Sequence, residues 1–192
     1  IEILKKSIIK IGNEKIKSSE SLNRVTANNI YLKEHYPLSD NSSFDGYAIK
    51  SIDTKNLGKS KKRLFKIIGS IAAGDKPNSL KTKKFRTFEV MTGGLIPKGF
   101  DTIIPVEKIV FYPYKTKPKY IIIDKKIKKF QHIRFKGSDF KKKDLLIKKG
   151  TIIQSNHILA LKTFGIQNIK VKKKPKILFF SSGNELTDNK KK

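Results

Sequence analysis

The stretch LSDNSSFDGYAIK at residues 38–50 separates two kinds of sequence pattern. Before it, apolar residues recur at helical spacing as far as Gly12, which predicts an amphipathic helix over residues 1–12, and a second short helix is expected around residues 19–29. After it, apolar residues come in short runs separated by turns. The runs are YAIK at 47–50, LFKIIGSI at 64–71, FRTFEVM at 85–91, DTIIPV at 101–106 and YIIID at 120–124. These runs predict a small β-domain.

The rest of the chain predicts further modules. HIRF at 132–135 and LLIKKGTII at 145–153 are interpreted as strands outside the small β-domain, and Ser155 can cap a helix that Gly165 ends. PKILFFSSGNEL at 175–186 is typical of the first strand of a parallel α/β sheet and its following turn, although an edge strand of an antiparallel sheet is the alternative. A parallel neighbour needs a crossover of about a dozen residues or more, so we expect only the start of that sheet here.

Composition limits the class of protein. The chain has 192 residues and 37% apolar content, which is enough to bury a core. It has no cysteine, which excludes disulfides and cysteine-based metal sites and fits a reducing compartment. No apolar run is long enough for a transmembrane helix, and the N-terminal pattern is not that of a secretory signal. A cytoplasmic protein without membrane association is therefore expected.

The formal net charge of +28 would by itself indicate nucleic acid or an anionic membrane surface as partner. Most of the 44 basic residues are lysines, however, whereas arginine supplies the fork that binds phosphates and bases in bidentate fashion. The arginines are Arg24, Arg63, Arg86 and Arg134. Because the lysines spread along the whole chain, we interpret the charge as a solvated surface and expect only non-specific nucleic-acid binding at low salt.

The segment DNSSFDGYA at 40–48 carries the densest chemical signal. Two aspartates bracket hydroxyl-bearing residues and lead into a glycine. Such a turn can present Asp45 to a hydrated Mg²⁺, and the same residues also favour a purely structural turn through their own side-chain hydrogen bonds.

Three further segments could bind an anion or a phosphate. In MTGGLIPKG at 91–99, paired glycines let backbone N–H groups approach an oxyanion, and Thr92 adds a donor. GSDF at 137–140 contains an aspartate in a turn. SSGNEL at 181–186 places an expected helix start after Gly183, where free N–H groups can meet a phosphate.

Taken in order, these segments resemble the molybdopterin molybdenumtransferase family, which includes the E domain of gephyrin. The shared segments are DNSSFDGYA at 40–48, AAGD at 72–75, MTGGLIPKGFDTIIPVE at 91–107, GSDF at 137–140, FG at 164–165 and PKILFFSSGNEL at 175–186. DGYA and MTG-x-x-x-P-x-G are the most specific of them. The family's later Gly-rich motifs and C-terminal β-domain have no counterpart in the sequence, so the resemblance is to the N-terminal portion.

The resemblance implies an enzyme that hydrolyses adenylylated molybdopterin and inserts molybdate into its dithiolene, with Mg²⁺ assisting. It implies catalytic roles for Asp45, Thr92, Asp139 and Glu185. It implies ligand binding by Gly93, Gly94, Ser182 and Gly183, and Mg²⁺ coordination by Asp45 and Glu185. An elongated homodimer, with a cleft between the α/β domain of one subunit and the small β-domain of the other, is implied as well.

The expected fold is therefore α+β, multi-module and elongated, with an inserted small β-domain and the truncated start of an α/β domain. The expected divisions are 1–12 for a helix associated with the α/β domain, 13–37 with 132–170 for a central module, 38–131 for the inserted β-domain and 171–192 for the start of the α/β domain. Three functions stay open: part of a molybdenumtransferase, a non-catalytic remnant of one, or a basic nucleic-acid-binding module.

Overall fold

A computed structural model of the chain describes residues 10–58, 60–76, 83–178 and 180. The chain forms two compact units. Unit 1 takes its residues from Ile1–Tyr31 and Leu145–Lys192, and unit 2 comprises Leu32–Asp144. The finer division into a central module, an inserted β-domain and the start of an α/β domain stays a prediction.

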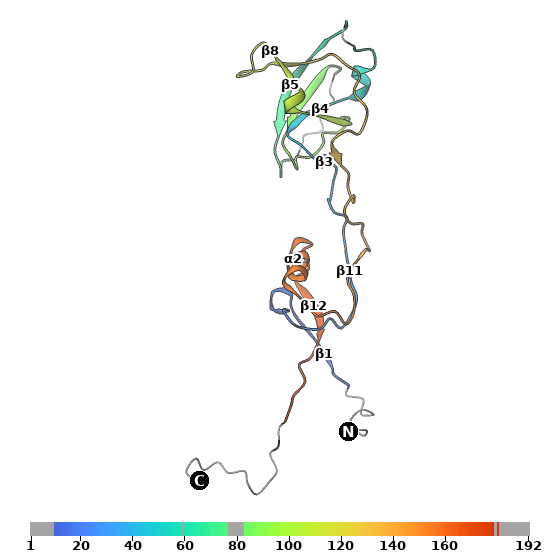
Figure 1. Cartoon of the computed structure of the whole chain (residues 1–192), viewed down its shortest axis with the longest axis vertical. Coiled ribbons are helices and arrows are strands. Elements are labelled where there is room, and N and C mark those ends of the chain that lie inside the picture. The colour runs from blue at the N-terminus through green and yellow to red at the C-terminus, as the bar shows by residue number, and fades with distance from the viewer. Residues whose placement is uncertain (1–9, 59, 77–82, 179, 181–192) are drawn as a thin grey trace. The chain divides into compact units, whose positions relative to one another are not determined.

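Unit 2 is built on a six-stranded sheet that curls into a half-barrel (Figure 1). In chain order its strands are β4 (Gly46–Ile49), β5 (Arg63–Ile71), β6 (Arg86–Val90), β7 (Thr102–Pro105), β8 (Val110–Tyr112) and β9 (Tyr120–Ile123). The spatial order is β7-β4-β6-β5-β9-β8, with β5 and β6 parallel and the other neighbours antiparallel. Two short 3-10 helices, η2 (Ser51–Thr54) and η3 (Val106–Lys108), follow β4 and β7.

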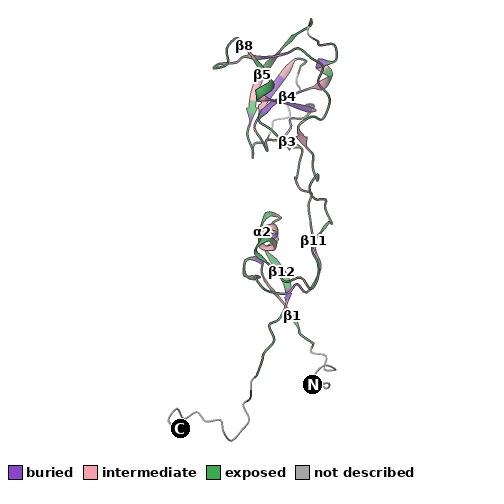
Figure 2. Ribbon diagram, in the orientation of Figure 1, coloured by how far each residue is buried: buried purple, intermediate pink, exposed green. Residues whose placement is uncertain are grey.

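Strand β4 lies inside this sheet and is buried along its whole length. Tyr47 and Ile49 pack into one apolar cluster, whereas Ala48 packs into another, so both faces of the strand are covered. This explains why GYAI reads as a continuous apolar run rather than as alternation. Gly46 is required at its start, because a Cβ there would lie 2.2 Å from the carbonyl oxygen of Ile104. Figure 2 shows the buried residues of unit 2 gathered on the strands of the sheet.

Unit 1 contains two antiparallel strand pairs and a helix. β1 (Asn13–Lys17) pairs with β12 (Asn168–Lys172), and β2 (Ile30–Tyr31) pairs with β11 (Leu145–Ile147). The helix is α2 (Ser155–Thr163), and a 3-10 turn, η1 (Ser18–Glu20), follows β1. The buried core of the unit consists of Ile147, Ile153, Leu161, Ile169 and Val171. In β12 the alternate residues Ile169 and Val171 face this core, as expected for a half-buried strand.

The helix predicted after Ser155 is confirmed, with one correction at its start. Ser155 is the first helical residue and not the cap, because Gln154 occupies the N-cap position in a reciprocal capping arrangement with His157. The N–H of Gln154 donates to His157 Nδ1 at 3.0 Å. The predicted end is correct: Gly165 has φ of +67° and its N–H donates to the carbonyl oxygen of Lys162.

The expected α+β class needs a correction, because the described residues are mostly β with one α-helix. The helix expected around residues 19–29 is wrong: only η1 forms there. Beyond η1 the backbone instead bridges to distant segments, Val25 to Ile152 and Thr26 to Val171. The Thr26 hydroxyl also donates to the carbonyl oxygen of Lys148 at 2.8 Å. Serine, threonine and asparagine side chains compete with helix formation, because they form hydrogen bonds with backbone groups.

Other expectations differ in extent. The five β-rich runs of the small β-domain all contain strands, but β8 was not predicted. In the run at 145–153 only Leu145–Ile147 forms a strand, because the chain turns at Gly150, where φ is +84°. The opening helix at 1–12 and most of the strand and turn at 175–186 fall outside the described residues. Within the described part of that run, Ile177, Leu178 and Phe180 are exposed.

Leu161 and Leu159 offer a matched test of the unit 1 core, since both lie on α2 but are 0% and 67% exposed. We expect Leu161→Ala to lower the free energy of unfolding by about 2–5 kcal/mol through lost burial and a residual cavity. Leu159→Ala should change it by less than about 0.5 kcal/mol. Urea unfolding followed through NMR signals of β12 measures both. Equal effects of the two substitutions would contradict this packing.

Candidate active site

Asp45 is the residue directly before the first residue of β4. Its backbone carbonyl accepts the N–H of Val106 at 3.0 Å, which ties the residue to the end of β7. Because β4 is paired with β6 on one side and with β7 on the other, strand pairing fixes the position of this residue. Its side chain is nevertheless exposed. A rigidly placed carboxylate that reaches solvent is well suited to meet a ligand.

Thr92 donates both of its hydrogen-bond donors to this carboxylate. Its backbone N–H lies 2.6 Å and its hydroxyl oxygen 2.8 Å from Asp45 Oδ1. Thr92 follows β6, which neighbours β4 in the sheet, so strand pairing brings together two residues that are 47 positions apart. No described residue donates a hydrogen bond to the second oxygen, Asp45 Oδ2. That oxygen keeps its full capacity to accept a hydrogen bond or bind a cation.

The hydrogen bonds from Thr92 hold the pKa of Asp45 below its ordinary value. The backbone N–H is the larger cause and the hydroxyl the second, while burial opposes them weakly. The carboxylate is thus ionised at neutral pH. Since the folded pKa is lowered, the stability it contributes is present above the unfolded pKa and is lost as the pH falls through the folded pKa.

Backbone hydrogen bonds connect the two loops that carry this pair. The N–H of Gly93 donates to the carbonyl oxygen of Ser42, and the N–H of Ser42 donates to the carbonyl oxygen of Gly94, both at 2.9 Å. The N–H of Ile96 donates to the carbonyl oxygen of Asp40 at 3.1 Å. The loop before β4 and the loop after β6 therefore form one ladder, and the contact between Asp45 and Thr92 lies at the end of it that adjoins the β4–β6 pair.

The paired glycines permit this close approach of the two loops, and ligand binding by them stays a prediction. The N–H of Gly93 is bonded to Ser42, and the N–H of Gly94 donates to the carbonyl oxygen of Met91 at 2.8 Å. A Cβ on Gly94 would lie 2.8 Å from the same oxygen, and Gly93 has φ of +79°. Both positions need glycine for the backbone itself.

Two residues that the sequence reasoning did not assign to the site hold this loop. Ser42 is buried, its hydroxyl donates to the carbonyl oxygen of Phe44, and the N–H of Phe44 donates to that hydroxyl at 3.3 Å. Asp40 Oδ1 accepts the N–H of Lys136 at 2.8 Å, which joins the loop to the returning chain. The sequence signal that could have identified them is the recurrence of Asp and Ser before Asp45, because side chains of these types form hydrogen bonds with nearby backbone.

Asp139 has a different environment. Both of its carboxylate oxygens accept hydrogen bonds from Arg134, and Ser138 Oγ donates to Oδ1 at 2.9 Å. These bonds, Arg134 first, lower the pKa of Asp139. Arg134 lies on β10 (Ile133–Arg134), which pairs with β3 (Asn41–Ser42) just ahead of Asp45. The ion pair therefore borders the same loop, but its carboxylate is already engaged.

The remaining predicted site residues, Ser182, Gly183 and Glu185, lie outside the described residues. Within the described part, no group of three or more His, Asp or Glu side chains could by itself hold a metal ion. Mg²⁺ commonly binds through one or two carboxylates together with water and substrate phosphates. Asp45 fits one such carboxylate ligand, because its Oδ2 atom is exposed and receives no donor from the described residues.

Two solved structures of Pyrococcus horikoshii share this fold. One, titled as a molybdopterin biosynthesis moea protein, matches with a TM-score of 0.81 and 29% identity over 91% of this chain and 43% of its own. The other, titled as a molybdopterin biosynthesis moeA protein, matches with a TM-score of 0.76 and 29% identity over 85% of this chain and 42% of its own. The half-barrel and its small strand pairs are thus a fold of molybdenum cofactor biosynthesis proteins.

The chain belongs to the family described as MoeA N-terminal region (domain I and II), which matches residues 1–165. A molybdopterin molybdenumtransferase of Staphylococcus aureus (strain Mu50) is 31% identical over 169 residues, or 88% of this chain. One of Staphylococcus epidermidis (strain RP62A) is 28% identical over 98% of it. The resemblance found in the sequence is confirmed. The chain spans 39% and 43% of the length of these two relatives. Among the described residues no helix is long and apolar enough to cross a membrane.

Thr92→Val tests the hydrogen bonds to Asp45. We expect the pKa of Asp45 to rise, because the hydroxyl donor is lost, but to stay below its ordinary value, because the larger backbone contribution remains. Carboxyl ¹³C chemical shifts followed against pH measure this directly. Asp139 is the internal control, since its pKa is lowered by Arg134 and should not change. An unchanged pKa of Asp45 would show that the hydroxyl does not stabilise its charge.

Proposed function

We propose that the chain supplies the Asp45 site of a molybdopterin molybdenumtransferase, which inserts molybdate into adenylylated molybdopterin. The observation that carries the proposal is a carboxylate held ionised by both donors of Thr92 at the end of the half-barrel sheet. The similarity to two molybdopterin molybdenumtransferases supports the reaction. Since those relatives extend well beyond the matched region, the rest of the machinery is part of the proposal and not of this chain's described structure.

In this function Asp45 is the residue that meets the reacting groups. Its Oδ2 atom accepts a proton or hydrogen bond from water, or ligates Mg²⁺, while Oδ1 stays fixed by Thr92. Bound Mg²⁺ would neutralise phosphate and oxyanion charge. Thr92 then acts as a positioning residue, because its two donors are hydrogen-bonded to the carboxylate and not to the anionic ligand.

The other proposed contributions follow the same logic. Arg134 fixes Asp139 in the ionised state beside the loop, where its negative charge can orient a cationic or hydrogen-bond-donating group. Glu185 would add a second Mg²⁺ ligand, and Ser182 and Gly183 would bind phosphate. A homodimer, with each cleft completed by the α/β domain of the other subunit, and a cytoplasmic location belong to this proposal.

Asp45→Asn tests the site with little disturbance of the fold, because the amide oxygen can still accept both donors of Thr92. We expect the rate of molybdenum insertion to fall by about a hundredfold or more, since the substitution removes the charge and the proton-accepting capacity. The assay uses the protein at its native length with adenylylated molybdopterin, molybdate and Mg²⁺. Reconstitution of a cofactor-free molybdoenzyme reports the product.

Asp124→Asn is the matched control, because Asp124 is an exposed carboxylate just past β9 and forms no hydrogen bond or ion pair with the described site residues. It should leave the rate within about twofold of the parent, as expected for a surface substitution. Activity of Asp45→Asn equal to that of this control would refute the assigned role. Absence of insertion by the parent protein would refute the proposed function.

A further inference from the structure

The segment KKIKKFQHIRFK at residues 125–136 of unit 2 combines basic and aromatic residues that reach solvent. Phe130 and Phe135 are 53% and 39% exposed. The lysines of the segment are all exposed, and they are Lys125, Lys126, Lys128, Lys129 and Lys136. Apart from Arg134, the proposed function uses none of these residues. Large aromatic side chains that gather at the surface of a folded unit commonly mark an interaction site.

Two residues of this segment have left-handed backbone conformations, which non-glycine residues rarely adopt. Phe130 has φ of +67° and His132 has φ of +57°. The N–H of Phe130 donates to the carbonyl oxygen of Asp101 at 2.8 Å. The carbonyl oxygens of Gln131 and His132 accept N–H groups from β7 and from the loop before β4, both at 3.0 Å. Strain of this kind persists where the surrounding structure fixes it, and it is common at functional sites.

The rings of the segment contact one another and the loop that carries Asp45. Phe130 and Phe135 meet edge to face with ring centroids 5.4 Å apart. His132 meets the ring of Phe44 in the same way at 5.1 Å, and Phe44 is 48% exposed. The Lys129 ammonium lies 4.6 Å from the centroid of the Phe130 ring. Unpaired nucleic acid bases stack on such exposed rings, while neighbouring cations meet the phosphates.

The lysines at the start of the segment border a hollow of about 250 Å³ beside β7 and η3. The polar side chains that line the hollow belong to Lys108, Lys125, Lys126, Lys128, Gln131 and His132. Among the described residues no carboxylate lines it, although Glu107 and Asp124 are exposed next to two of its lysines in sequence. A phosphodiester chain needs a band of positive charge and not one convergent site, because each lysine acts as a point charge.

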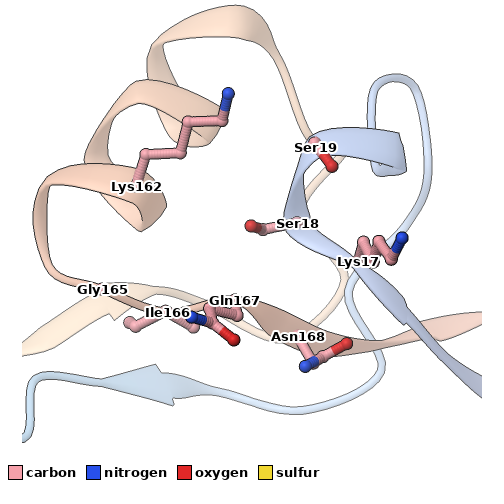
Figure 3. A pocket seen from close by; sticks show the side chains of 8 residues that line it. All are labelled: Lys17, Ser18, Ser19, Lys162, Gly165, Ile166, Gln167 and Asn168. Carbon is pink, nitrogen blue, oxygen red and sulfur yellow. The ribbon is translucent and has the colours of Figure 1, made fainter.

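A larger hollow in unit 1 shows that positive charge alone does not make such a surface. It measures about 460 Å³ and lies between η1, the C-terminal end of α2 and the start of β12 (Figure 3). Its two lysines, Lys17 and Lys162, lie on opposite sides of it. None of the described residues that line it is aromatic, so a base has no ring to stack against there.

We propose that residues 125–136, together with Phe44 and Lys108, bind single-stranded nucleic acid. Phe130 and Phe135 stack on bases and the lysines contact phosphates. The exposed Gln131 amide forms hydrogen bonds with base edges. The surface adjoins the loop of Asp45 but uses neither catalytic proposal residue of that loop. This binding is therefore additional to the proposed function, and it is more specific than the general attraction expected from net charge.

The experiment measures fluorescence anisotropy of labelled oligonucleotides with the purified chain at about 0.15 M salt. The probes are single strands of oligouridylate and oligothymidylate of about 12 nucleotides, a duplex of the same length and inorganic polyphosphate as competitor. The single strands should bind at least about fivefold more tightly than the duplex or polyphosphate, because only they offer free base faces. The tighter of the two single strands identifies RNA or DNA as the ligand.

Phe130→Ala should weaken binding of the single strands by about tenfold or more and leave its salt dependence unchanged, since a stacking ring is lost but no charge. Phe135→Ala should weaken binding as well, which separates the loss of a ring from any change at the strained backbone of Phe130. Tyr114→Ala is the matched control, because Tyr114 is 72% exposed on the lysine-rich loop between β8 and β9. It should change affinity by less than about twofold.

The charge of the surface is tested by the combined variant Lys125→Gln, Lys126→Gln and Lys128→Gln. The slope of log affinity against log salt should become smaller by about 2, at about 0.7 for each lost phosphate contact. The control removes the same charge from exposed lysines between β8 and β9 with Lys115→Gln, Lys117→Gln and Lys119→Gln. This second variant should leave the slope nearly unchanged.

Equal effects of Phe130→Ala and Tyr114→Ala, or of the two lysine variants, would overturn the proposal in favour of general attraction between charges. Polyphosphate binding as tight as single-strand binding would overturn it as well. Self-association that Phe130→Ala abolishes, with unchanged oligonucleotide affinity, would show instead that the rings pack against a second copy of the chain.

Discussion

The contact between Asp45 and Thr92 depends on one constraint, the close approach of two loops across the half-barrel sheet. The ladder between residues 40–42 and 93–96 sets that approach, and Gly94 permits it because any Cβ there would strike backbone oxygen. Strand β4 fixes the other side by its burial between β6 and β7. The carboxylate therefore receives its two donors from a rigid frame, and the lowering of its pKa is a property of the fold rather than of the residue alone.

The chain reaches this frame and returns from it through nested antiparallel pairs. β1 pairs with β12 and β2 with β11 in unit 1, and β3 pairs with β10 in unit 2. Each outgoing segment thus runs beside its returning counterpart. Ion-pair and side-chain bonds reinforce the arrangement within each unit: Arg24 binds Glu14 and the carbonyl oxygen of Lys172, and Asp40 binds the N–H of Lys136. Such pairings between distant segments offset the entropy of closing long loops.

The local pattern predicted some elements well and failed at others for identifiable reasons. The five apolar runs of unit 2 became strands because burial and alternation are encoded in consecutive residues. The expected helix over 19–29 failed because its backbone found partners near Ile152 and Val171, positions that no local window includes. Strand β8 was missed because Val110–Tyr112 is short and mostly exposed. The family resemblance came from several turn motifs in a particular order, and one motif alone would not have indicated the family.

The sequence by itself determined the strand runs, the helix end at Gly165, the absence of cysteine chemistry and the aspartate in front of GYA. Only the tertiary structure decided what those groups do. It bonded the N–H of Gly93 to Ser42 and the N–H of Gly94 to Met91, directed both donors of Thr92 to Asp45 and engaged Asp139 with Arg134. The physical reason is that sequence patterns report local interactions, whereas these contacts join distant segments. Periodicity and turn propensity act between neighbouring residues, whereas hydrogen-bond partners 47 or 149 positions apart are chosen only when strands pair.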